Sequence, residues 1–309
     1  MRAHVSRRSL AVLAAGAAAL LAAACGPGAV LTAETPDQSV AAALQTAQTT
    51  PLRAAMTGQV TLDTSSLSGL PASIRSALGK LGSGGSATGQ LVQESGARRQ
   101  LTASAGGSSV RLVEYDGHGY VSQDGGGYAE VSGTLPASAS ITSTELTTAV
   151  AALSFQDQGP ATVSGVSTER YTASITVPSL EKVAQALGGS ATGSTQLAPM
   201  LAMLARYVTG SGSVDLWVSI RDGSLVRGTL SGSLSVDVGA AASALAGLLA
   251  PSSGSASLPA GTLGVSLSLG FDVSDYGSSV TVTKPVATST LPAGGAWSGM
   301  MGMGSGASI

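Results

Sequence analysis

An unbroken alternation of apolar residues with small or polar residues constrains the fold of this chain more than any other feature. Between Leu263 and Ser274 every odd-numbered residue is Leu, Val or Phe, and every even-numbered residue is Gly, Ser or Asp. A repeat of two residues predicts a strand with one buried and one solvated side. Val214–Ile220 and Val226–Val238 show a similar pattern, so we expect an antiparallel sheet whose apolar face is covered by other elements.

Shorter stretches of the same kind predict the other strands, and turn residues separate them. One strand begins at Met56, and the dipeptide Asp116-Gly117 predicts a hairpin between two others. The remaining expected strands are Thr88–Gln93, Arg98–Ala103, Val110–Tyr115, Gly119–Gln123, Tyr128–Val131, Thr162–Val166, Arg170–Val177 and a closing strand with Val280 and Val282.

Helical spacing of apolar residues predicts the elements that cover the sheet. Thr35-Pro36-Asp37-Gln38 is typical of a capped helix start, and this helix is expected to reach about Gln48. Further helices are expected at Leu67–Leu81, Ser143–Leu153, Leu180–Leu187, Gln196–Val208 and Ala240–Ala250. The predicted fold class is therefore α+β. After Pro285 the periodicity is lost, so Val286–Ile309 is predicted to be a disordered tail.

Residues 1–24 resemble a lipoprotein signal peptide. Arg2, Arg7 and Arg8 precede roughly 15 mostly apolar residues, fewer than the ~20 that a membrane-spanning helix needs. Ala22-Ala23-Ala24-Cys25 resembles the lipobox, in which the cysteine receives a diacylglycerol and becomes the first mature residue. We therefore expect cleavage before Cys25, a lipidated tether over residues 25–34, and a position on the extracytoplasmic face of the cell membrane.

Two alternatives remain open at this end of the chain. The lipobox usually has Leu three residues before the cysteine, where this chain has Ala22, so a plain secretory signal is the other interpretation. Cys25 is the only cysteine and lies at the cleavage point, which favours lipidation. The stretch Ser6-Arg7-Arg8-Ser9-Leu10 is typical of a twin-arginine export signal and equally of an ordinary positive n-region.

Composition excludes several classes of function. Without residues 1–24 the chain keeps twelve basic and seventeen acidic residues, and this net charge of −5 argues against a nucleic-acid partner. With Cys25 acylated, no internal disulfide is left. His118 is the only histidine after the signal, which excludes zinc sites built from cysteine and histidine. The chain has neither a P-loop nor a dinucleotide fingerprint, and no cofactor or metal is expected.

An enzyme is the least favoured interpretation. Glu114, Asp116 and His118 lie close together in sequence, and a hairpin would bring them near one another. However, no nucleophile stands out among the many serines, and beside the Asp116-Gly117 turn His118 is expected to be an exposed turn residue. Arg98 and Arg99 suit a lipid phosphate, although a solvated strand end is the simpler explanation.

The order of these segments resembles the LppX/LprG family of actinobacterial envelope lipoproteins over about Ala33–Pro285. The most specific part is Ser274–Pro285, a Gly turn followed by Val280-Thr281-Val282 and a proline. Supporting parts are Val113–Tyr120, Val163–Val166 leading to Arg170-Tyr171, and Val214–Val218 before Asp222-Gly223. Expected helical insertions at Ser65–Ser86 and Gly239–Ala260 depart from the family pattern.

The resemblance implies a strongly curved antiparallel sheet, like an opened half-barrel, packed on helices around an apolar cavity. It implies a single lipid-binding domain over residues 35–285, similar in shape to the periplasmic lipoprotein-localisation carriers. The ligand would be a lipid or lipoglycan whose acyl chains fill the cavity, carried within the envelope with an envelope transport protein as a further partner. The residues expected to line the cavity are Val60, Leu112, Val113, Val121, Leu146, Val150, Ile175, Leu201, Leu204 and Leu267.

Without the resemblance, the apolar faces are explained as an ordinary core that fills itself. In that case the alternative function is a ligand-free scaffold that binds another envelope protein.

Overall fold

Twelve strands hydrogen-bond into one continuous sheet, in a computed structural model that describes residues 35–68, 85–132, 143–188, 207–240 and 260–292. The strands are β1 (Leu52–Asp63), β2 (Gly85–Ser95), β3 (Arg98–Ala105), β4 (Ser108–Tyr115), β5 (His118–Gln123), β6 (Tyr128–Ser132), β7 (Gln156–Val163), β8 (Val166–Thr176), β9 (Val208–Ser219), β10 (Leu225–Asp237), β11 (Thr262–Ser274) and β12 (Ala287–Pro292). An alternating sequence explains strands such as β11, because each side of the pleat carries one kind of residue.

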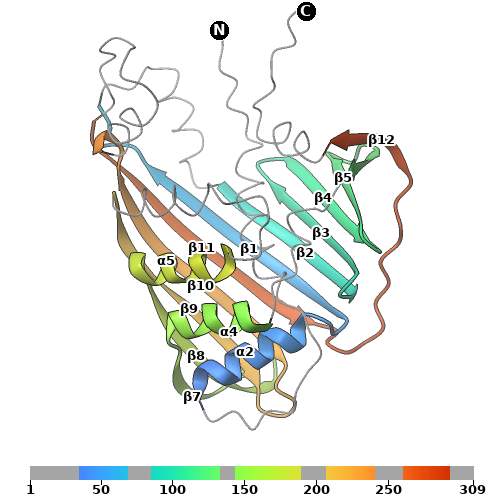
Figure 1. Cartoon of the computed structure of the whole chain (residues 1–309), viewed down its shortest axis with the longest axis horizontal. Helices are drawn as coiled ribbons and strands as arrows, with labels where there is room; N and C mark the ends of the chain where they lie inside the picture. The colour runs from blue at the N-terminus through green and yellow to red at the C-terminus, as the bar shows by residue number, and fades with distance from the viewer. Residues whose placement is uncertain (1–34, 69–84, 133–142, 189–206, 241–259, 293–309) are drawn as a thin grey trace, which may run out of the picture.

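The order across the sheet is β12-β6-β5-β4-β3-β2-β1-β11-β10-β9-β8-β7. Neighbours pair antiparallel, except that β12 runs parallel to β6, so the sheet is mixed. Figure 1 shows the sheet strongly curved and not closed, with β12 and β7 at its two edges. At its centre β1 and β11 lie side by side, with Arg53 opposite Ser274 and Asp63 opposite Gly264. The predicted α+β class and the curved open sheet are confirmed.

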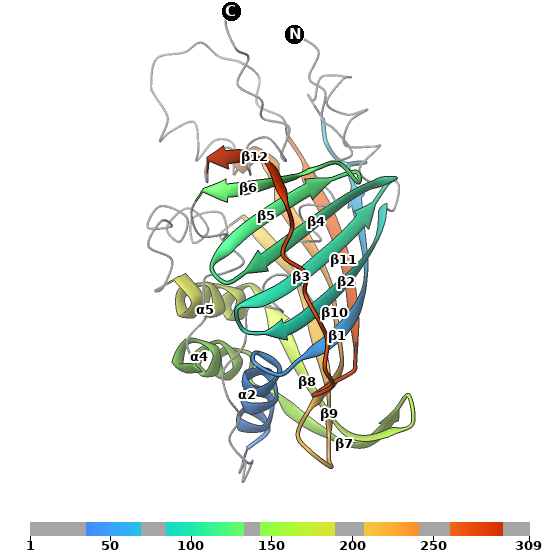
Figure 2. The same ribbon diagram turned by 90° about the vertical axis from the view of Figure 1, so that its right-hand side faces the viewer.

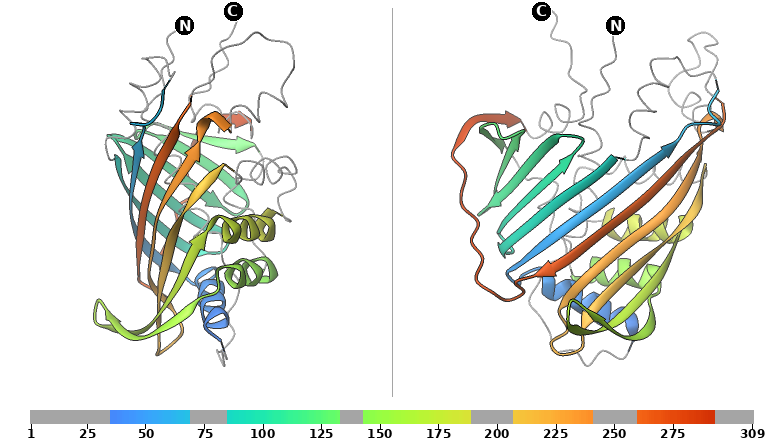
Figure 3. Two further views of the ribbon diagram at one scale, coloured as in Figure 1. Left: turned by 90° about the vertical axis from the view of Figure 1, so that its left-hand side faces the viewer. Right: turned by 180° about the vertical axis from the view of Figure 1, so that it is seen from behind.

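Three described helices lie on one side of this sheet. They are α2 (Pro36–Ala47), α4 (Ser143–Leu153) and α5 (Val177–Gly188). Figure 2 shows them stacked along the concave side, and their sheet contacts are with β7, β8, β9 and β10. Figure 3 shows the opposite, convex side, which the helices leave uncovered. We call these two sides of the sheet the concave face and the outer face.

The predicted start of α2 is confirmed in detail. The Thr35 hydroxyl accepts a hydrogen bond from the backbone N–H of Gln38, and the Gln38 side chain accepts one from the backbone N–H of Thr35. Pro36 occupies the first turn, where its missing N–H costs nothing. The Asp37 carboxylate accepts a hydrogen bond from the backbone N–H of Phe155, which ties this first turn to the chain just before β7.

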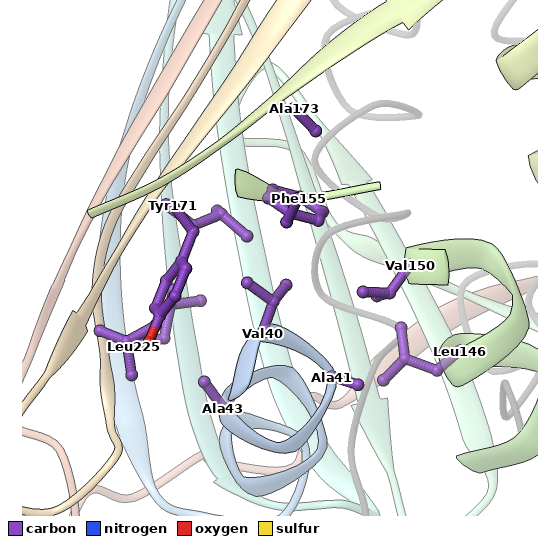
Figure 4. Packing of buried hydrophobic residues seen from close by; sticks show 11 residues of the cluster. Val40, Ala41, Ala43, Leu146, Val150, Phe155, Tyr171, Ala173 and Leu225 are labelled. Carbon is purple, nitrogen blue, oxygen red and sulfur yellow. The ribbon is translucent and has the colours of Figure 1, made fainter. Parts of the chain in front are cut away.

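The helices form a tightly packed core with one part of the concave face. Val40, Ala41 and Ala43 of α2 pack against Leu146 and Val150 of α4 (Figure 4). The same cluster includes Phe155, which lies between α4 and β7, and five residues of the sheet: Tyr171, Ala173, Leu216, Val218 and Leu225. Because Val40 and Ala43 are completely buried, this part of the concave face is filled.

The segment after β11 lies on the outer face rather than in the sheet. Figure 2 shows it crossing β3, β4 and β5 on its way to β12. Val280 and Val282 are buried there against Val92, Val113 and Tyr120. The predicted closing strand at Val280 and Val282 is therefore wrong, although both side chains are buried as an apolar pair would suggest. We call residues 279–286 the strap.

The prediction of a disordered tail from Val286 onward is also wrong for its first part. Ala287–Pro292 form β12, which pairs with β6 and extends the sheet beyond the expected boundary at Pro285. The reason is that β12 has no apolar alternation, so its strand character comes from backbone pairing with β6. Residues 293–309 lie outside the described part of the chain.

Several other predictions fall on residues that the structure does not describe. These are the signal and tether at 1–34, most of the helices expected at Leu67–Leu81, Gln196–Val208 and Ala240–Ala250, and most of the two insertions. The last residue of the helix expected at Gln196–Val208 is described: Val208 begins β9 and therefore does not belong to a helix.

Candidate functional site

A cavity of about 300 Å³ lies on the concave face where β1, β11, β10, β9 and β8 meet the start of α5. Its lining is aliphatic or glycine apart from two serines of the sheet: Val60, Ile175, Leu180, Ser211, Gly212, Leu230, Ser231, Gly232, Leu234, Val265 and Leu267. Ser231 is exposed, and Ser211 and Ser231 alternate with the inward-facing residues, so their hydroxyls belong to the outer face. None of the described lining residues is charged, which makes this part of the cavity suited to hydrocarbon.

One row of paired residues crosses the floor of this cavity. The register places Val60 opposite Leu267, Leu267 opposite Gly232, Gly232 opposite Gly212, and Gly212 opposite Ile175. The two glycines form a low point between larger aliphatic side chains. A Cβ added to Gly232 would lie 3.1 Å from the Cα of Gly212, so β9 and β10 approach closely here.

Helix α5 bounds the cavity without filling it. Its contacts are mainly with α4, and it touches β8 and β9 much less. Leu180, in its first half, lines the cavity while 38 % of its surface stays exposed. Leu180 therefore marks the side on which the cavity reaches the surface.

A smaller hollow of about 40 Å³ lies next to this cavity on the same face, over β1, β2 and β3. Small residues make it, since Gly58, Ala87, Gly89 and Ala103 point to the concave face there. Leu269 of β11 lines it, and the neighbouring inward residue Leu267 lines the larger cavity. Leu269 therefore borders the hollow, whereas the larger cavity crosses β11 at Leu267 and reaches Val60 on β1.

The predicted cavity residues divide into five groups. Val60, Ile175 and Leu267 line the cavity. Leu112 and Val121 lie on the concave face, in a buried cluster with Leu52 and Leu101. The remaining residues are placed as follows: Leu146 and Val150 pack within the helix core, Val113 lies on the outer face, and Leu201 and Leu204 fall outside the described residues.

Val113 is the described candidate that lies on the face of the sheet opposite the cavity. It is completely buried, but its neighbours are the strap valines and Tyr120 rather than the cavity. Adjacent residues of a strand point to opposite faces, so Leu112 takes the concave face that had been expected for Val113. The physical reason is that the strap supplies a second apolar environment on the outer face of β4.

Eight lining residues were not among the predicted ones: Leu180, Ser211, Gly212, Leu230, Ser231, Gly232, Leu234 and Val265. The sequence signal for Leu230, Leu234 and Val265 was present, because they belong to the apolar side of the alternating strands. The glycines interrupt that apolar side in β9 and β10, and such interruptions mark places where another group comes close to the backbone.

The charged residues of the β3–β5 region form ion pairs with one another. Arg99 pairs with Glu114 at 2.6 Å, Arg98 pairs with Asp116 at 2.8 Å, and the His118 Nδ1 lies 2.8 Å from the Glu130 carboxylate. The hydrogen bonds from Arg98 keep the pKa of Asp116 below its ordinary value. Glu114, Asp116 and His118 therefore each face a different partner. His118 is exposed, as predicted.

Other types of site find little support in the described part of the chain. No group of three or more His, Cys, Asp or Glu side chains lies close enough there to hold a metal ion. A further cleft of about 460 Å³ lies between α2 and the β9–β10 turn, beside Ser39, Glu169 and Tyr171. Among the described helices, each is too short or too polar to cross a membrane.

Comparisons with known proteins give distant structural likenesses only. No protein-family model and no curated protein sequence matches the chain. The structure is similar to LprF from Mycobacterium bovis, with 11% identity, 75% of this chain and 90% of that chain covered, and a TM-score of 0.34. It is also similar to Mycobacterium tuberculosis lipoprotein LppX, with 15% identity, coverages of 76% and 90%, and a TM-score of 0.34.

A third similar structure is an outer membrane lipoprotein-sorting protein domain from Vibrio parahaemolyticus, with 7% identity, coverages of 74% and 87%, and a TM-score of 0.21. At TM-scores this low, none of these likenesses says what the chain binds.

Proposed function

We propose that this chain is a membrane-anchored lipoprotein that binds a lipid or lipoglycan by its acyl chains and carries it within the cell envelope. The observation that carries the proposal is the cavity on the concave face, which has a hydrocarbon lining and a volume typical of the smaller ligand sites. Polar headgroups have no charged partner in that lining, so they would remain outside it.

The membrane anchor is the second part of the proposal and rests on the sequence. Cys25 follows three alanines after an arginine-bearing apolar segment, which supports lipidation there. We expect the change Cys25→Ala to release the protein from the membrane fraction of cells that process the signal. A variant that stays membrane-bound after signal cleavage would contradict the lipidated anchor, whatever the cavity holds.

The cavity part of the proposal is tested by filling the cavity. The protein is purified from cells, and native mass spectrometry measures its bound lipid. We expect the wild type to carry lipid and Ile175→Trp to carry much less, because the indole ring would occupy the acyl-chain space. Ser174→Trp is the matched control, since Ser174 is the preceding residue of β8 and is exposed on the outer face.

Two results would contradict the carrier proposal. A wild type without lipid, in both native spectra and organic extracts, would favour a ligand-free scaffold. Equal lipid loss in Ile175→Trp and Ser174→Trp would show that the loss comes from general damage to β8 and not from filling the cavity.

A further inference from the structure

We infer that the opposed glycines Gly212 and Gly232 determine which lipids fit: they create a slot for the end of one unbranched alkyl chain. This inference rests on the proposed carrier function and adds the chemical class of the chain. The register places these glycines opposite each other on the concave face of β9 and β10. They are the lowest points of the cavity floor.

Aliphatic side chains flank Gly232 along β10, and the inward neighbours of Gly212 along β9 are Val214 and Gly210. Along β10 the neighbouring inward residues are Leu230 and Leu234, which stand four residues apart, or roughly 13 Å along the strand. Once the two leucine side chains are subtracted, the remaining gap suits a single alkyl chain. Methyl branches would collide with the leucine walls, because the backbone beneath the slot leaves no room for a branch to move down.

Aliphatic side chains stand at both ends of the slot. Ile175 lies opposite Gly212 on β8, and Leu267 lies opposite Gly232 on β11. Beyond Leu267 the cavity continues to Val60 on β1. Leu180 of α5 is partly exposed, so a chain can enter on the side of this helix. Leu267 therefore limits how far the inserted chain extends towards Val60.

The close approach of the strands makes Gly232 the better position for a substitution. A Cβ at Gly232 would lie 3.1 Å from both the Gly212 Cα and the Ser211 carbonyl oxygen, which asks for a small adjustment. A Cβ at Gly212 would lie 2.5 Å from the Ser231 carbonyl oxygen, which demands a backbone shift. Gly270 is the matched control, because an added Cβ there points to the outer face and meets Thr57 Oγ1 at 3.3 Å.

The experiment uses the full mature chain after delipidation, with straight-chain fatty acids from decanoic to stearic acid and branched phytanic acid as probes. Calorimetry measures their affinities, and circular dichroism confirms folding. We expect phytanic acid to bind at least ten times more weakly than palmitic acid. We expect Gly232→Ala to lose about tenfold in palmitic acid affinity, which corresponds to roughly two displaced methylene groups, while Gly270→Ala binds as the wild type does.

Leu267→Ala keeps the inference testable if Gly232→Ala does not fold. Removing the Leu267 side chain should shift the preferred fatty acid to a longer chain, because the slot then extends towards Val60. Equal binding of phytanic and palmitic acid, a folded Gly232→Ala with wild-type affinity, or an unchanged length preference in Leu267→Ala would overturn the inference. If lipid still co-purifies with the wild type in those cases, the carrier proposal stands and only the glycine slot is wrong.

Discussion

Two neighbouring parts of the concave face have the same alternating sequence pattern but end up as different kinds of interior. In the first, Tyr171, Leu216 and their neighbours meet α2 and α4 directly and form a filled core. In the second, only a few residues further along the same strands, Gly212 and Gly232 replace large side chains and a cavity remains. The difference shows that the alternation itself does not decide between core and cavity. The first part is packed against α2 and α4, whereas the second part has two inward glycines facing each other.

The largest expected effect comes from truncating one leucine in each part. Leu216→Ala removes a buried side chain from the filled core and should cost about 3 kcal/mol, because a cavity is left behind. Leu234→Ala removes a side chain that already borders open space and should cost about 1 kcal/mol. Urea unfolding of the delipidated proteins measures both. Equal costs would show that the cavity is closed and packed in solution.

A bulky substitution at two adjacent residues of β4 tests the assignment of faces. Val113→Trp should cost roughly 1–3 kcal/mol, because its ring must enter the fully packed contact with the strap. Its bound lipid, corrected for the folded fraction, should not change. If Val113→Trp instead displaces lipid from a stable protein, then the outer-face position of Val113 is wrong. Leu112→Trp is the companion variant, since Leu112 lies on the concave face.

Two truncations of the chain end distinguish the contribution of the strap from that of β12. A protein that ends at Pro285 keeps Val280 and Val282 but loses the parallel pairing of β12 with β6. We expect a loss of about 1 kcal/mol, or roughly 2–4 °C in Tm, because β12 is a short edge strand in which Thr288, Ser289 and Thr290 are exposed. A protein that ends at Ser278 should melt markedly lower. Equal melting of the two truncated proteins would show that the strap contributes nothing.

The smallest expected effect is a pH dependence in the filled core. Burial raises the pKa of Tyr171 above its ordinary value of 10.0, and the carboxylates of Glu169 and Asp157 add to this, against an opposing hydrogen bond with Ser39. The folded state therefore holds this proton more tightly than the unfolded state does. Its contribution to stability is intact below about pH 10 and is lost as the pH rises towards the raised pKa.

Melting temperatures measured at increasing alkaline pH would show this loss as a slope. Tyr171→Phe is the control, because it has no phenolic proton and should lack that part of the slope. The absence of any difference between the two slopes would contradict the raised pKa. The cavity residues carry no such group, so Ile175→Val should keep the wild-type slope.

The sequence predicted most of the sheet because each strand carries its own evidence. The alternation from Leu263 to Ser274 defines β11 and its apolar side without reference to any other segment. The capping residues Thr35 and Gln38 likewise define the start of α2 locally. Such features are predictable because the residues that cause them are near one another in the chain.

The faces and the cavity were harder to predict because they depend on distant partners. Leu112 and Val113 are both apolar, and only the strap, far along the chain, makes the outer face a suitable place for Val113. Gly212 and Gly232 are visible in the sequence, but that they lie opposite each other follows from the register of β9 and β10. β12 was missed because its strand depends on β6 and not on its own residues.

Because β11 lies between β1 and β10, the two halves of the sheet can join only after β11 has been made. β1 precedes every other strand in the chain, β11 follows all but β12, and the two meet at the centre of the sheet. The hairpins on either side join strands close in sequence and can form early, whereas joining β1 to β11 closes a very long loop. A growing chain therefore first forms two separate groups of paired strands, β1–β6 and β7–β10. Until β11 joins them, the free edge of β1 is the place most exposed to pairing with another molecule.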